Sequence, residues 1–168
     1  MSRTAKPRLS EEGQQALAQF ERYLREEEDL SAPTLRNYLS DLHQFMAWCE
    51  STWEEGGESR QPFTPAAVAT PAITRYRSYL QTVAQLKPAT INRYLISLKR
   101  YFSWAADTGL IQRDPAKVVK LVEQEEQPPR HMTDQEENVL VAAVTAGGSL
   151  RDRTIITLML HTGLRAQE

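Results

Sequence analysis

Two stretches of the chain place arginine and lysine among short side chains that can form hydrogen bonds, at spacings that put them on one face of a helix. The residues are Arg36, Asn37, Ser40, His43 and Gln44 in the first stretch and Asn92, Arg93, Lys99 and Arg100 in the second. Guanidinium and ammonium groups position phosphates, and amide and hydroxyl groups read the edges of bases. The mixture therefore predicts a surface that contacts DNA, and a solvated polar surface is the alternative.

The two helices that would carry these residues follow one pattern. The segment TLRNYLSDLHQFMAW, which starts at Thr34, aligns without a gap with TINRYLISLKRYFSW, which starts at Thr90. Apolar residues recur in both at the spacing of one helical face, which predicts two amphipathic helices packed on a common core. We expect the first to end near Ser51, and the second to open at Lys87 and end near Gly109, where glycine suits a helix C-terminus.

Two further helices are expected before and between them. Ser10, followed by two glutamates, is typical of an N-cap with acids in the first turn, and it predicts a helix that ends near Glu28. Thr70 and Pro71 predict an N-cap and a proline at the first position of another helix. Residues 54–65 contain two glycines and two prolines and predict an exposed loop. No stretch predicts a strand, so the expected fold class is all-α.

Length and composition are those of a globular protein. The 168 residues are 40% hydrophobic and 25% charged, enough for one packed domain and a short second segment. No apolar run approaches the roughly 20 residues that span a bilayer, and the first residues lack the apolar core of a signal peptide. The lone cysteine, Cys49, is expected to be a small core or boundary residue and not a reactive thiol. These features favour a cytoplasmic protein without a membrane association.

Charge is distributed unevenly along the chain. The net charge is only −2, but residues 9–59 carry three basic and twelve acidic residues, whereas residues 71–120 carry nine basic and two acidic ones. A basic segment of this kind is a hint of a polyanionic partner. The second half of the expected helical domain is therefore the part that would face DNA.

A domain boundary is expected after the fourth helix. A short basic helical piece with Lys117 and Lys120 leads into EQEEQPPR, residues 123–130, which has the composition of a linker. We assign residues 1–122 to the first domain, 123–131 to the linker and 132–168 to the start of a second domain.

The second segment begins with a clear helix signal. Thr133 and Glu136 have the spacing of a capping box, and the later apolar run TIITLMLHTGLR is expected to form a fully buried helix. About 40 residues are too few to hold a core of their own. Three arrangements therefore stay open for this segment: it is mobile, it packs on the first domain, or it pairs with a second copy.

Four segments in one order resemble the tyrosine recombinases, the family of phage integrases and Xer-type site-specific recombinases. LSAPTLRNYLSDLHQFMAWC and LKPATINRYLISLKRYFSWAADTGLIQRDPAKVV are similar to the two signature helices of its SAM-like core-binding domain. PPRHMTDQEENVLV resembles the opening of its catalytic domain, apart from Met132 where leucine is more common, and RDRTIITLMLHTGLRAQE resembles the segment with its first catalytic arginine. The resemblance implies a four-helix SAM-like domain (an orthogonal helical bundle), followed by a linker and the first helices of a truncated catalytic domain.

By this resemblance Arg165 corresponds to the first arginine of the active site. In the family a tyrosine attacks the scissile phosphate and forms a 3′-phosphotyrosine intermediate, with neither metal nor cofactor. A guanidinium donates two parallel hydrogen bonds to the phosphate oxygens as they gain charge. Gly163 would allow close backbone approach, and Glu168 would orient the guanidinium. His131 and His161 are assigned no chemistry.

The resemblance also implies how the first domain meets double-stranded DNA. The second and fourth helices of the family domain enter the major groove. On this sequence the first-ranked DNA contacts are Arg93, Lys99 and Arg100, and the second-ranked ones are Lys87, Thr90, Arg36 and Asn37. The whole protein is expected to be a tetramer on DNA, and this chain alone a monomer or a weak dimer.

The family's remaining catalytic residues, a lysine, a His-x-x-Arg pair, a further His or Trp and the tyrosine, follow the first arginine. None of them follows Glu168. We therefore expect these 168 residues to be a fragment that binds DNA but does not cleave it. Two alternatives stay open, namely a SAM-like protein-interaction module and a naturally truncated regulator of recombination.

Overall fold

The computed structural model describes residues 8–55, 61–124 and 130–164, and all regular structure in these ranges is helical. The chain divides into two compact units, residues 1–124 and 125–168. The elements of the first unit are α1 (Glu11–Glu27), α2 (Ala32–Glu55), the short 3-10 helix η1 (Pro65–Ala67), α3 (Thr70–Thr82) and α4 (Pro88–Asp107). The second unit contains α5 (Asp134–Gly147) and α6 (Leu150–Thr162). The predicted all-α fold is confirmed.

Local signals in the sequence account for the start of α1 and the end of α4. The Ser10 hydroxyl accepts a hydrogen bond from the Gly13 backbone N–H at 3.0 Å, as expected of an N-cap. Gly109 follows α4 with a φ of 75°, a left-handed conformation that glycine adopts without strain. Helix α2 continues past the expected end at Ser51, where Trp53 stacks on Phe63 with ring centroids 6.4 Å apart.

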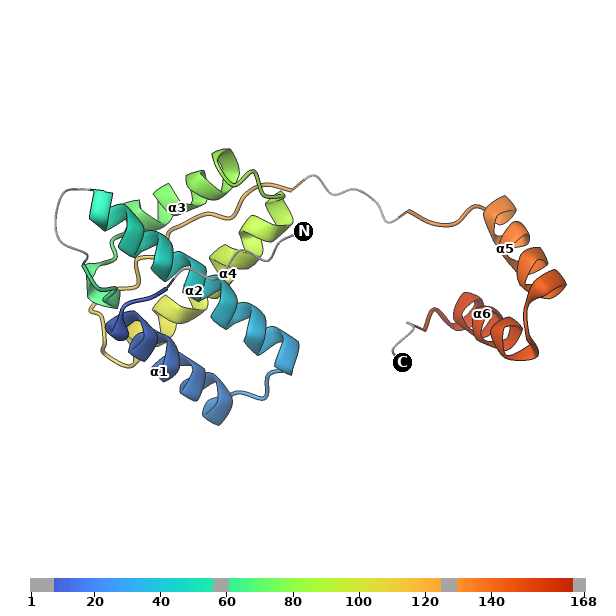
Figure 1. Cartoon of the computed structure of the whole chain (residues 1–168), viewed down its shortest axis with the longest axis horizontal. Coiled ribbons are helices and arrows are strands. Elements are labelled where there is room, and N and C mark those ends of the chain that lie inside the picture. The colour runs from blue at the N-terminus through green and yellow to red at the C-terminus, as the bar shows by residue number, and fades with distance from the viewer. Residues whose placement is uncertain (1–7, 56–60, 125–129, 165–168) are drawn as a thin grey trace. The chain divides into compact units, whose positions relative to one another are not determined.

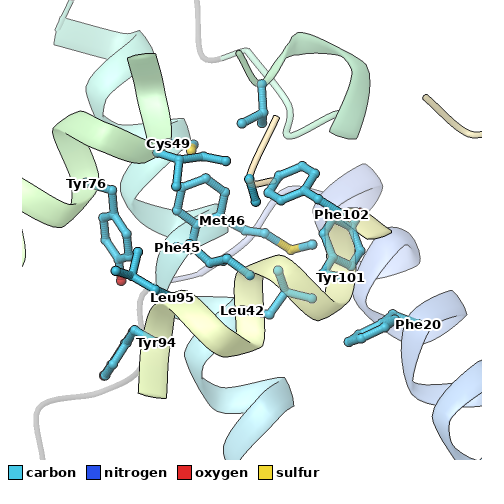
Figure 2. Close-up of a cluster of buried hydrophobic side chains, with 14 of the residues drawn as sticks. Phe20, Leu42, Phe45, Met46, Cys49, Tyr76, Tyr94, Leu95, Tyr101 and Phe102 are labelled. Carbon is cyan, nitrogen blue, oxygen red and sulfur yellow. The ribbon is translucent and has the colours of Figure 1, made fainter. Parts of the chain in front are cut away.

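The core of the first unit lies between α2 and α4, with α1 and α3 packed against them (Figure 1). Apolar side chains at matching positions of the two repeated helices meet there, including Leu42, Phe45, Tyr101 and Phe102 (Figure 2). Phe45 contacts four aromatic rings, with the Tyr76 centroid 5.1 Å away. Close packing of this kind makes the unit sensitive to the loss of any large side chain.

Cys49 is part of the same core, as the sequence predicted. Its side chain is buried, and burial raises the pKa of the thiol. A thiol whose pKa is raised is protonated and unreactive at neutral pH. Cys49 therefore contributes packing to this unit.

A buried carboxylate joins the start of α1 to the end of α2. Glu50 accepts hydrogen bonds from the Ser10 backbone N–H and hydroxyl and from the Phe63 backbone N–H, the last at 3.0 Å. A Cβ on Gly13 would lie 2.9 Å from a Glu50 carboxylate oxygen, so a larger residue there would have to displace the carboxylate. The contact holds the N-terminal cap and residue 63 on one end of α2.

The segment after α4 returns along α3 and α4 and is held there by side chains. The Thr70 hydroxyl donates to the Pro115 carbonyl at 2.9 Å, and the Arg77 guanidinium donates to the Lys120 carbonyl at 2.9 Å. The expected helical piece at Lys117 and Lys120 is wrong, because residues 115–118 form a turn and residues 119–124 have no regular structure. Thr70 is likewise not the N-cap of α3, since Ala69 occupies that position.

In the second unit each helix begins with a capping box. Thr133 and Glu136 form the predicted one at α5, and Ser149 and Asp152 form another at α6. The prediction that α6 is fully buried is wrong, because Ile155 is 42% and Leu158 is 51% exposed. None of the described residues in this unit is buried. Its two helices pack on each other without enough surface to enclose a core.

Within the described parts of the chain, no helix is long and apolar enough to cross a membrane.

Candidate nucleic-acid interface

The outward stripe of α4 carries Arg93 and Arg100, two of the three charged residues that the sequence ranked first. Residues 89, 93, 96, 100, 103 and 107 recur at steps of three or four, and all are exposed or half-buried. Two grooves run beside this stripe, one with Lys99 and Arg100 in its lining and one with Asn37 and Arg93. Both grooves include Tyr38 and Ile96. We call the residues Asn37, Tyr38, Arg93, Ile96, Lys99 and Arg100 the α2–α4 surface.

The side chain of Arg93 is anchored by Asp41 and Tyr94. Its guanidinium Nη1 lies 2.8 Å from each carboxylate oxygen of Asp41, and its Cζ lies 5.0 Å from the centroid of the Tyr94 ring. Asp41 is 1% exposed and also accepts a hydrogen bond from the Ser97 hydroxyl at 2.9 Å. The side chain of Arg93 is 41% exposed, so an anchored guanidinium faces solvent on this surface.

The electrostatics of Asp41 reflect its burial. Desolvation raises the pKa of its carboxyl group, although the Ser97 hydroxyl and the Arg93 guanidinium both lower it. The balance shows that the ion pair offsets only part of the free energy needed to remove this charge from water.

Lys99 and Arg100 also have partners within the chain. The Lys99 ammonium donates to the carbonyls of Ala116 and Lys117, at 2.9 and 3.2 Å, and so holds the turn after α4. Arg100 forms an ion pair with Glu28 just after α1, and this hydrogen bond raises the pKa of the guanidinium. The Arg100 side chain is still 44% exposed. The Glu28 side chain is only 14% exposed, so this ion pair is partly buried while its arginine still reaches solvent.

Asn92 does not belong to the exposed face. Its side-chain amide pairs with the backbone of Val122, donating to the carbonyl at 2.9 Å and accepting from the N–H at 2.8 Å. Asn92 is 7% exposed. Asn92, which the sequence pattern placed on the polar face, therefore binds the segment after α4 to the helix.

The remaining predicted contacts lie in different places. Asn37 is exposed and lines the groove beside Arg93. Arg36 is exposed but lines a separate groove with three acidic residues in and just after α1, so the structure does not bring it onto the α2–α4 surface. Lys87 and Thr90 lie at the start of α4, exposed and half-buried respectively, and line neither groove.

Sequence reasoning missed Tyr38, which it counted among the apolar residues of the helix, and three further residues at this site. Asp41 and Ser97 anchor Arg93, and Ile96 is exposed in the middle of the charged stripe. A signal was present for Ile96, because its position aligns with the polar Ser40 in the repeated pattern. The anchoring by Asp41 depends on two helices crossing and has no local signal.

Arg165 and Glu168 lie outside the described residues, so their arrangement is not part of this site. Among the side chains that are described, no group of three His, Cys, Asp or Glu residues could hold a metal ion. The candidate site of the described chain is the α2–α4 surface.

Comparison with known proteins identifies the family of the domain that carries this surface. Residues 17–109, more than half of the chain, match the phage integrase N-terminal SAM-like domain. Curated relatives include tyrosine recombinase XerC of Chlorobaculum tepidum, 28% identical over 90% of this chain and 50% of its own length. Others are XerC of Syntrophus aciditrophicus (29% identical, covering 90% and 49%), and tyrosine recombinase XerD of Lacticaseibacillus casei (27% identical, covering 90% and 49%).

The chain spans about half the length of these relatives. No solved structure matches it significantly. The match covers α2, α3 and α4 in full and α1 from Leu17 onward, which are the helices that build the core and the α2–α4 surface. The chain therefore belongs to the tyrosine recombinase family through its SAM-like phage integrase N-terminal domain.

Proposed function

We propose that this chain is the DNA-binding portion of a site-specific tyrosine recombinase. Residues 1–122 are its core-binding domain, residues 123–131 a linker, and residues 132–168 the first part of its catalytic domain. The α2–α4 surface enters the major groove of double-stranded DNA.

The observation that carries this proposal is the exposed stripe of α4, on which Arg93 and Arg100 lie two helical turns apart. The major groove is about 12 Å wide and admits an α-helix. Anchored guanidinium groups on such a helix reach phosphates on either side, and Asn37 on α2 adds an amide that can pair with a base edge. Lys99 adds positive charge even while its ammonium holds the turn at 115–118.

In the whole protein, Arg165 is proposed to stabilise the charge that develops on the scissile phosphate. Strand cleavage and rejoining through a 3′-phosphotyrosine would need residues beyond those of this chain. The exposed apolar side chains of α5 and α6 would then lie in the interior of the catalytic domain. The names of the relatives, which are recombinases over about twice this length, support that assignment.

The proposal is tested by the salt dependence of DNA binding. Fluorescence anisotropy with a random-sequence duplex of about 30 base pairs gives the dissociation constant at several salt concentrations. Replacing Arg93 and Arg100 by alanine should weaken binding and reduce the slope of log K against log salt by about one unit for each phosphate that the variant no longer neutralises. A slope that does not change would contradict the assignment of this surface.

Two further variants sharpen the test. Arg25→Ala is a matched control, because Arg25 is also an exposed arginine paired with a glutamate, Glu21 at 2.7 Å, but lies on α1. It should leave the slope unchanged. Glu28→Gln removes the competing partner of Arg100 and should strengthen binding severalfold at low salt.

A further inference from the structure

Ile96 is the one large apolar side chain that α1–α4 expose among their described residues. It is 45% exposed and lies three residues after Arg93 and four before Arg100, so the three side chains share one face of α4. Both grooves of the α2–α4 surface include it. A single exposed isoleucine is ordinary on a protein surface. What requires explanation is its place between two arginines.

The chemistry of the major groove offers an apolar partner at such a position. Thymine carries a C5 methyl group on its major-groove edge, and apolar side chains recognise it by contact. We infer that Ile96 is a specificity-determining residue that contacts a thymine methyl group, a role that rests on the proposed DNA binding.

The surroundings of Ile96 suit this role. An isoleucine in a helix has one strongly preferred χ1 rotamer, so little conformational entropy is lost when it meets a base. Arg93 is held by Asp41, at 2.8 Å, and by the Tyr94 ring, and Arg100 by Glu28. The flanking guanidinium groups can bind phosphates while the isoleucine between them faces the base edges.

The experiment compares thymine with uracil, which lacks only the C5 methyl group. The full chain first enriches binding duplexes from a random-sequence pool, and the enriched pool is then prepared with either base throughout. The wild-type chain should bind the thymine form about fourfold more tightly for each methyl group that it touches, the factor that burial of one methyl group is worth. Ile96→Ala should bind the two forms equally.

A matched control is Leu110→Ala, since Leu110 is 44% exposed but lies after α4 and lines a different groove. This variant should keep the wild-type preference for thymine. A preference that survives in Ile96→Ala, or equal binding of both forms by the wild-type chain, would overturn the inference while leaving the proposed DNA binding intact. Absence of binding to either duplex would overturn both.

Discussion

The two units of this chain both contain helices that begin at a side-chain N-cap, but they differ in what they enclose. Residues 1–124 bury a core of large side chains, among them Phe45 and Tyr101, both 0% exposed. In the described part of residues 125–168 no side chain is buried, although α5 and α6 both begin with a complete capping box. A complete capping box at a helix start therefore does not by itself produce a buried core.

The difference separates two sources of stability. A capping box satisfies backbone N–H groups within one turn, and its contribution is about 1 kcal/mol. Burial of a large apolar side chain contributes about 1.5–3 kcal/mol and requires partners from other elements. The first unit has such partners in α1–α4, whereas the second has only α5 and α6 and, among its described residues, one cross-helix hydrogen bond, from Arg153 to the Thr145 carbonyl at 3.0 Å.

The largest effect is expected from opening a cavity in the core of the first unit. Phe45→Ala should lower its free energy of unfolding by about 3–5 kcal/mol, because the ring packs among four others. Leu158→Ala in the second unit should change that free energy by less than about 0.5 kcal/mol, since Leu158 is 51% exposed. Urea denaturation followed by tryptophan fluorescence measures both.

All three tryptophans, Trp48, Trp53 and Trp104, lie in the first unit, so the fluorescence reports on its unfolding alone. If Phe45→Ala and Leu158→Ala lowered this free energy of unfolding equally, Leu158 would have to belong to the same core, and the contrast between the two units would be wrong.

A smaller, pH-dependent effect is expected at Asp41. Asp41→Asn replaces one carboxyl oxygen by an amide N–H donor that faces the donors of Arg93 and Ser97, and should destabilise the first unit by about 1–2 kcal/mol at pH 3.5. Burial raises the pKa of the Asp41 carboxyl in the folded state above its ordinary value of 3.8. The wild-type protein therefore loses stability as the pH rises from about 3.8 through the raised pKa, because the carboxyl group must ionise in its buried position. The destabilisation by Asp41→Asn should therefore be larger at pH 3.5 than at pH 7.

Urea denaturation of the wild-type chain and of Asp41→Asn at pH 3.5 and pH 7 measures this effect. The other carboxyl groups are the same in both proteins, so their contributions cancel in the difference between the two free energies of unfolding. If the destabilisation by Asp41→Asn were larger at pH 7 than at pH 3.5, the Arg93 guanidinium would lower the pKa of Asp41 by more than burial raises it.

The smallest effect on global stability is expected at a helix cap of the second unit. Ser149→Ala removes the acceptor of the Asp152 N–H and should loosen α6 by about 1 kcal/mol, seen as faster amide exchange in its first turn. The free energy of unfolding of the first unit should not change. Ser10→Ala, its counterpart at α1, should lower that free energy measurably, because Ser10 also donates to the buried Glu50. If Ser149→Ala and Ser10→Ala changed the free energy of unfolding of the first unit by the same amount, the contrast between the two units would be wrong.

Much of the fold could be predicted from the sequence, because helix ends and apolar stripes are local. Ser10, Gly109 and the pair Thr133 and Glu136 act within a few residues, and the structure confirms each of them. The failures concern contacts between distant segments. The local pattern assigns Thr70 to a cap, but its hydroxyl meets Pro115, 45 residues away.

The candidate site was predictable only as a set of residue types. Periodicity placed Arg93 and Arg100 on one face of a helix, and the structure agrees. It could not separate Asn92, which clamps Val122, from its exposed neighbours, nor assign Arg36 to another groove. Those distinctions depend on where other segments pass over the helix.

By itself, the sequence determined the helices, their apolar faces and the family, because these follow from patterns repeated within a few turns. Only the tertiary structure decided that Asp41 anchors Arg93 across 52 residues, that Glu28 pairs with Arg100, and that α6 stays exposed. Ion pairs and burial are properties of the packed arrangement. Their strength depends on distance and on exclusion of water, which no spacing along a single helix specifies.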